Sequence, residues 1–119
     1  MTSASNVNDT AIRCQRQSAA ALVQVIGLGA KAKLPCVSWK LGYGVTLVAQ
    51  CLNTDMQERR AAFLAWAKFL GIADWRSTEH HGVTHLHGVT EEAFDGGVQP
   101  RCRVVLTADL YDNGLGDRP

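Results

Sequence analysis

The clearest pattern in the chain is an alternation of apolar and mainly polar residues close to its C-terminal end. From Cys102 to residue 110 every second residue is apolar. A period of two is typical of a strand with one buried face and one open face. We therefore predict a strand over residues 101–111, with Arg103, Thr107 and Tyr111 on its open face.

Four shorter β-prone runs precede this strand and fall into two pairs. The members of each pair are separated by three residues that include glycine, which adopts the positive φ angles of tight turns without strain. This spacing predicts two hairpins. The pairs are residues 36–41 with 45–52, and residues 75–79 with 83–89.

A helical period is visible in the first third of the chain. Apolar residues between positions 12 and 26 fall on one helical face, and Asp9 and Thr10 are both favourable N-cap residues. Gly27 and Gly29 follow, and we expect them to end this helix. The same glycine spacing occurs in dinucleotide-binding turns, but a proline follows too soon for the helix that such a turn requires.

The second helical segment has the best-defined ends. Thr54 and Gln57 have the spacing of a capping box, strong helix formers run from Met56, and Gly71 stands where a C-terminal glycine belongs. The complete order is then α-β-β-α-β-β-β. We predict an α+β fold in which two helices pack on one face of a five-stranded, mainly antiparallel sheet.

The predicted elements form one domain over residues 9–111, between a flexible tail of residues 1–8 and a loose tail of residues 112–119. A chain of 119 residues with 46% hydrophobic and 19% charged residues has the size and composition of one globular core. The first nine residues are polar, and no apolar run approaches the ~20 residues that span a bilayer. We expect a cytoplasmic protein without membrane contact, with its four cysteines free.

Charge is unevenly distributed, although the net charge is only +1. Residues 1–40 contain five basic residues and one acidic residue. Four of these basic residues are candidate contacts for nucleic-acid phosphates, although no nucleic-acid-binding motif accompanies them. A nucleic-acid-associated protein of a mobile element is therefore one alternative function. The candidates are Arg13, Arg16, Lys31 and Lys33.

All four histidines lie between positions 80 and 87. His85 and His87 are two residues apart on a predicted strand, so both rings leave the same face. His80, at the preceding turn, would complete a three-nitrogen site suited to zinc with one open position. A zinc-binding protein or metal-dependent hydrolase is a second alternative. Histidines on an exposed hairpin also occur without a ligand, and we expect no resident cofactor.

Several segments resemble small proteins of high-GC actinobacteria and their mobile elements. The segments are Leu34-Pro35 with Trp39, the helix over residues 60–66 that ends in Leu70-Gly71, and His85–Gly88. The resemblance extends over about residues 20–111. It implies an origin and a fold, and since no activity is established for those proteins it assigns no functional residue here.

No nucleophile-elbow, P-loop or HExxH motif is present in the sequence. A long alternating strand needs pairing or cover, which favours self-association. We therefore expect a non-enzymatic interaction or regulatory module that acts through protein–protein binding as a homodimer. The candidate contacts are Arg103, Thr107 and Tyr111 on the open sheet face, and Leu64, which interrupts the polar side of the second helix.

Overall fold

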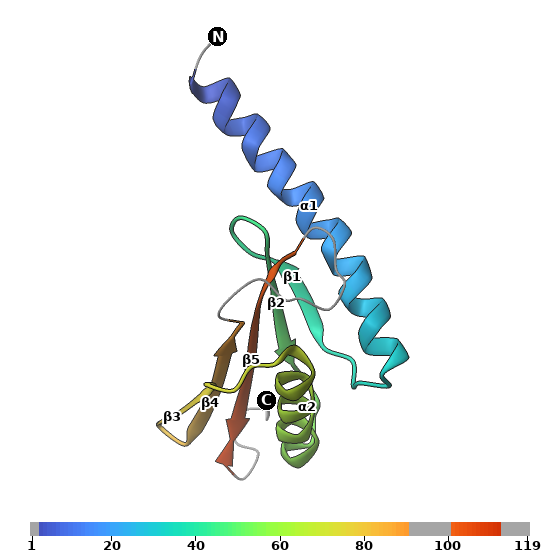
Figure 1. The fold of residues 1–119 in the computed structure, drawn as a ribbon. Helices are drawn as coiled ribbons and strands as arrows, with labels where there is room; N and C mark the ends of the chain where they lie inside the picture. The colour runs from blue at the N-terminus through green and yellow to red at the C-terminus, as the bar shows by residue number, and fades with distance from the viewer. Residues whose placement is uncertain (1–2, 91–100, 113–119) are drawn as a thin grey trace.

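A five-stranded sheet carries two helices on one of its faces, in the computed structural model of the chain (Figure 1). The structure describes residues 3–90 and 101–112. The predicted α+β class and element order are confirmed. The elements are α1 (Ser3–Lys31), β1 (Ser38–Leu41), β2 (Thr46–Cys51), α2 (Met56–Leu70), β3 (Arg76–His80), β4 (Val83–Val89) and β5 (Arg103–Tyr111).

The strand order is β1-β2-β5-β4-β3, which places the last strand at the centre of the sheet. Both predicted hairpins are present, as β1–β2 and β3–β4, and β4 also pairs with β5 in antiparallel orientation. β2 and β5 are parallel, which the sequence pattern did not predict. The chain between β2 and β5 contains α2 and the β3–β4 hairpin. This long connection brings the chain back to the end of the sheet at which β2 begins, so β5 runs in the same direction as β2.

The core lies between the inner face of the sheet and α2. Phe63, Leu47 and Leu106 are fully buried there, and each contributes about 1.5–3 kcal/mol through removal of its side chain from water. Trp66 of α2 packs edge-to-face against Trp39 of β1, with ring centroids 5.5 Å apart. Its indole Nε1 donates a 2.8 Å hydrogen bond to a backbone carbonyl. Both tryptophans therefore serve the core rather than the surface.

The first helix is longer than the sequence pattern predicted. It begins at Ser3, so residues 3–8, expected in a flexible tail, are helical, and it continues through Gly27 and Gly29 to Lys31. The chain turns away from the helix two residues after this end, at Lys33, which has a positive φ of 59°. In spite of its length, α1 is not apolar enough to cross a membrane, and no other helix among the described residues has the required length and apolar character.

Gly29 is explained by close packing rather than by helix termination. A Cβ at this position would lie 2.5 Å from Cη2 of Trp66, whereas a Cβ at Gly27 would meet nothing within 4 Å. The absence of a side chain at Gly29 thus allows α1 and α2 to approach each other.

The second helix has its predicted bounds but a different N-cap. The Asp55 carboxylate accepts hydrogen bonds from the backbone N–H groups of Gln57 and Glu58, at 2.8 and 3.1 Å. The expected capping box from Thr54 is therefore wrong by one residue, since Asp55 occupies the cap. Gly71 ends the helix in the left-handed region, as predicted, with φ of 74°.

The two glycines of α1 give a matched test of the helix packing. Gly29→Ala should lower the free energy of unfolding by about 1–3 kcal/mol, because the added methyl group displaces Trp66. Gly27→Ala should raise it by up to ~1 kcal/mol, because alanine is the better helix former in open space. Urea unfolding of both variants measures the difference. Equal effects of the two substitutions would contradict this account of the α1–α2 contact.

Candidate functional site: the open face of the sheet

The face of the sheet opposite the helices is uncovered by any other described segment (Figure 1). Strand register brings its side chains into rows, because residues that pair across strands leave the same face. One row joins Arg76, His87, Thr107 and Gln50 across four strands. The charged residues on this face are Lys40, Arg76, Arg103 and Asp109.

Three of the four predicted interface residues gather on this open face. Arg103, Thr107 and Tyr111 alternate with the buried residues of β5; Arg103 is exposed, and the other two are half-buried. Leu64 is 40% exposed, but it lies on α2, on the other side of the sheet. The structure thus separates Leu64 from the other three candidates.

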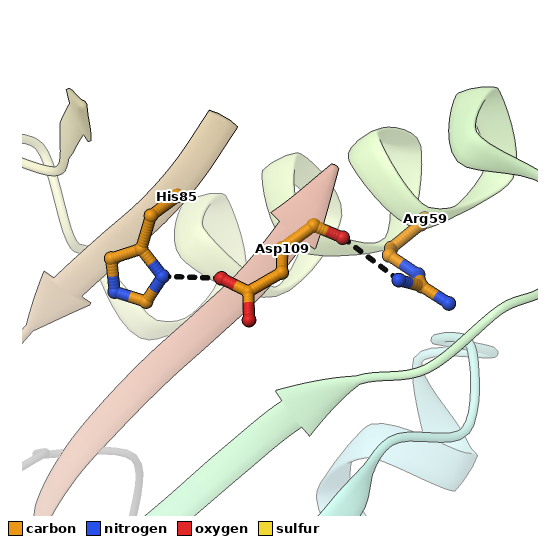
Figure 2. A network of polar contacts seen from close by, with 3 residues as sticks. All are labelled: Arg59, His85 and Asp109. Carbon is orange, nitrogen blue, oxygen red and sulfur yellow. Dashed lines mark hydrogen bonds and ion pairs between the residues drawn. The ribbon is translucent and has the colours of Figure 1, made fainter. Parts of the chain in front are cut away.

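Asp109 has polar contacts on both sides of the sheet. It pairs with His85 in the β4–β5 register, and its Oδ1 lies 2.5 Å from Nδ1 of that ring. On the opposite side, the Asp109 backbone carbonyl accepts a 2.8 Å hydrogen bond from Nη1 of Arg59 (Figure 2). Because an ionised carboxylate only accepts hydrogen bonds, we infer that Nδ1 of His85 carries the ring proton.

Arg59 is a buried cation, only 5% exposed, that reaches from α2 to the point where β2 leaves the sheet. The last pair of the β2–β5 ladder is Cys51 with Ala108, so β5 continues beyond its neighbour. Arg59 takes the place of that neighbour: its Nε donates a 2.7 Å hydrogen bond to the Asn53 carbonyl, and its Nη1 donates to Asp109. The guanidinium carbon also lies 5.9 Å from the centroid of the Tyr111 ring.

The burial of Arg59 was not predicted, although the sequence contains a signal for it. Residue 59 has helical spacing to Ala62, Phe63 and Trp66, which are all buried. A charged residue on the apolar stripe of a helix requires hydrogen-bond partners in the interior. That position therefore pointed to a buried polar contact.

The histidines do not all come together. By register His80 leaves the same open face as His85 and His87, because it pairs with Val83. The rings of His85 and His87 have centroids 6.0 Å apart. The ring of His80 instead packs against His81 near the β3–β4 turn, with centroids 4.0 Å apart. Within residues 3–90 and 101–112, no group of three or more His, Cys, Asp or Glu residues is arranged to hold a metal. The three-histidine zinc site stays a prediction without support from this geometry.

The basic candidates lie on and just after α1. Arg13, Arg16 and Lys31 are exposed along the helix, and Lys33 is the exposed residue at its end. Arg13 and Lys31 are separated by ~27 Å of helix at the usual rise per residue. These residues therefore form an extended basic edge rather than a compact site, and nucleic-acid binding stays a prediction.

Among the described residues, one depression lies along β1 and another at the turn that follows it. One, of about 260 Å³, is on the open face and is lined by residues that include Lys40, Gln50 and Thr107. The other, of about 480 Å³, separates α1 from the β1–β2 turn and is lined by residues that include Cys14 and Tyr43. Neither contains an acid–base pair of the kind formed by Asp109 and His85.

The buried thiols are held in their neutral form. Burial raises the pKa of Cys51 from its ordinary value of 9.0 to about 11, against the attraction of the nearby Arg59, and burial also raises the pKa of Cys102. All four cysteines are free: Cys14 is half-buried and Cys36 is exposed. Cys51 and Cys102 are therefore poor candidates for nucleophilic chemistry, which requires the thiolate.

The chain matches no protein-family model, no curated protein and no solved structure. The resemblance to small actinobacterial proteins accordingly stays a prediction. Function is inferred from the residues of the open face.

Replacement of Arg59 tests its role at the end of β2. Arg59→Met keeps an apolar stem but removes the donors, which leaves the Asn53 and Asp109 carbonyls without these hydrogen bonds. We expect the free energy of unfolding to fall by about 3 kcal/mol. The control is Arg60→Met, a change at the exposed neighbour, which should alter it by less than ~0.5 kcal/mol. Similar urea midpoints for the two variants would refute the structural role of Arg59.

Thiol labelling tests the burial of Cys51 and Cys102. Because its pKa is about 11, only about one Cys51 in a thousand is a thiolate at pH 8. Folded protein should react with Ellman's reagent at Cys36 and more slowly at Cys14, while Cys51 and Cys102 react only after unfolding in urea. A Cys51→Ala, Cys102→Ala variant should give the same folded-state signal. A smaller signal from that variant would show that the buried thiols are accessible.

Proposed function

We propose that this protein is a non-enzymatic interaction module that forms a homodimer through the open face of its sheet. The observation that carries the proposal is the composition of this uncovered face, which mixes half-buried apolar residues with oppositely charged ones. Val48 and Val105 are neighbours in the β2–β5 register at its centre, and both are half-buried. An apolar centre inside a polar rim is the usual arrangement of a protein–protein interface.

The flat area of the strands is somewhat smaller than a standard protein–protein interface. β5 has nine residues and extends over ~30 Å, and the other four strands are shorter. The 31 residues of the five strands, at ~3.3 Å per residue and ~4.8 Å between strands, give a face of roughly 500 Å². A standard protein–protein interface buries about 800 Å² of each partner. Two such sheets would pack face to face at a separation of ~10 Å.

Charge complementarity favours a second copy of this chain as the partner. Arg103 and Asp109 lie on the same strand and the same face, six residues apart. A two-fold axis that runs β5 antiparallel to β5 of the second copy places each Arg103 opposite an Asp109, twice per dimer. Thr107 then lies near the axis, and Tyr111 lies toward the periphery. His85 engages Oδ1 of Asp109, which leaves Oδ2 for the arginine of the second copy.

Charge reversal tests this arrangement. Arg103→Asp places two aspartates opposite two aspartates, and Asp109→Arg places two arginines opposite two arginines. Each variant alone should dimerise roughly 100-fold more weakly, since like charges in an interface cost several kcal/mol. An equimolar mixture of the two variants should form a heterodimer, because both contacts are then attractive. Sedimentation equilibrium measures the dimerisation of each variant alone and of the mixture.

The matched control is Arg60→Asp, the same charge change on the exposed side of α2, which should leave the dimer unchanged. Circular dichroism confirms that each variant is folded. A monomeric wild-type protein would refute the proposed function. So would a dimer that Arg103→Asp does not weaken, or a mixture of the two variants that stays monomeric.

A further inference from the structure

Two histidine rings and a carboxylate occupy neighbouring positions on β4 and β5. His85 and His87 leave the same face, and their ring planes are 29° apart with centroids separated by 6.0 Å. The side chain of His85 is 45% exposed, so its ring is open to solvent. Two imidazoles that share a tetrahedral zinc ion have centroids ~5 Å apart, given a zinc–nitrogen distance of ~2.1 Å. Asp109 holds the His85 ring, so a movement of the exposed His87 ring that brings the centroids ~1 Å closer places both on one ion.

The second observation is the carboxylate behind His85. Asp109 lies 2.5 Å from Nδ1, and Figure 2 shows the other ring nitrogen pointing away from Asp109. Histidine ligands in metal sites donate their second ring N–H to a carboxylate or carbonyl, which fixes the tautomer and makes the coordinating nitrogen more basic. Here that partner is already in position.

The carboxylate is itself held in place before any ion binds. The backbone of Asp109 is fixed by its pairing with His85 in the β4–β5 ladder and by the hydrogen bond from Arg59. Sites supported in this way lose little entropy when the ligand arrives, because the orienting group does not have to be ordered.

We propose that Nε2 of His85 and a ring nitrogen of His87 bind one late first-row divalent metal ion per chain, with Asp109 as a positioning residue. Imidazole ligands suit Zn²⁺, Ni²⁺ and Cu²⁺. The remaining coordination positions are open to water or to a donor from a bound molecule. This site differs from the three-histidine site expected from the sequence, since His80 lies with His81 near the turn.

The first experiment is calorimetric titration of the untagged protein with Zn²⁺ alone, with native mass spectrometry for stoichiometry. One ion per chain is expected. His85→Gln and His87→Gln should each abolish detectable binding or weaken it at least tenfold. Asp109→Asn should weaken it 10- to 100-fold, as for other residues that orient a histidine ligand. The matched controls His80→Gln and His81→Gln should leave it unchanged.

A measurement without metal shows whether Asp109 orients the His85 ring or only stabilises the fold. ¹⁵N-detected histidine spectra should place the His85 proton on Nδ1 in the wild type, and this preference should be lost in Asp109→Asn. Unchanged zinc affinity in His85→Gln or His87→Gln, a loss of binding in His80→Gln, or no saturable binding would overturn the proposal. Thermal unfolding of each variant without metal confirms that it is folded.

The metal site lies within one chain and does not require the homodimer. Arg103→Asp should therefore weaken dimerisation yet retain one zinc ion per chain. A dimer that binds no zinc overturns the metal site alone, and a zinc-binding monomer overturns the dimer alone. Loss of zinc binding in Arg103→Asp would also overturn the single-chain site, because it would require ligands from both copies.

Discussion

The buried guanidinium of Arg59 is the constraint on which both layers of the molecule depend. Where β2 ends, β5 would expose backbone carbonyls to the interior, and an unpaired carbonyl there costs as much as a lost hydrogen bond. Arg59 donates to the carbonyls of Asn53 and Asp109 at this point. It thereby joins the first turn of α2 to the segment that follows β2 and to the end of β5. The Tyr111 N–H, 3.4 Å from Sδ of Met56, forms a second link between β5 and α2.

This arrangement connects the core to the open face through a single residue. Asp109 is held by its carbonyl from the helix side and presents its carboxylate on the other side, where it contacts His85 (Figure 2). A substitution at Arg59 therefore removes one of the two contacts that hold the backbone behind this carboxylate, the other being the β4–β5 ladder. The interaction that completes the fold is also the one that orients the candidate site.

The sequence pattern predicted those features that depend on periodicity. The alternation in β5 identified both its buried residues and its open face, and the pairing of His85 and His87 on one face followed from the same period.

Features that depend on contacts between distant segments were not predictable in this way. Gly29 resembled a helix stop, and only the proximity of Trp66 shows why it lies inside α1. Thr54 and Asp55 are both good cap residues, and in the structure Asp55 is the cap. The parallel β2–β5 pair likewise leaves no local signature, since local patterns do not encode strand order.

Asp109 also determines how the two proposed activities of the open face are related. Its carboxylate has two oxygens: Oδ1 engages His85, and Oδ2 is available to Arg103 of a second copy. A metal ion on His85 draws electron density from the ring and strengthens its hydrogen bond to Oδ1, which reduces the negative charge that Oδ2 offers to arginine. If both proposals hold, metal binding and dimerisation would oppose each other, and linkage would require the opposition to be equal in both directions. The coupling is transmitted through one carboxylate and needs no movement of the backbone, because Arg59 and the β4–β5 ladder hold Asp109 in both states.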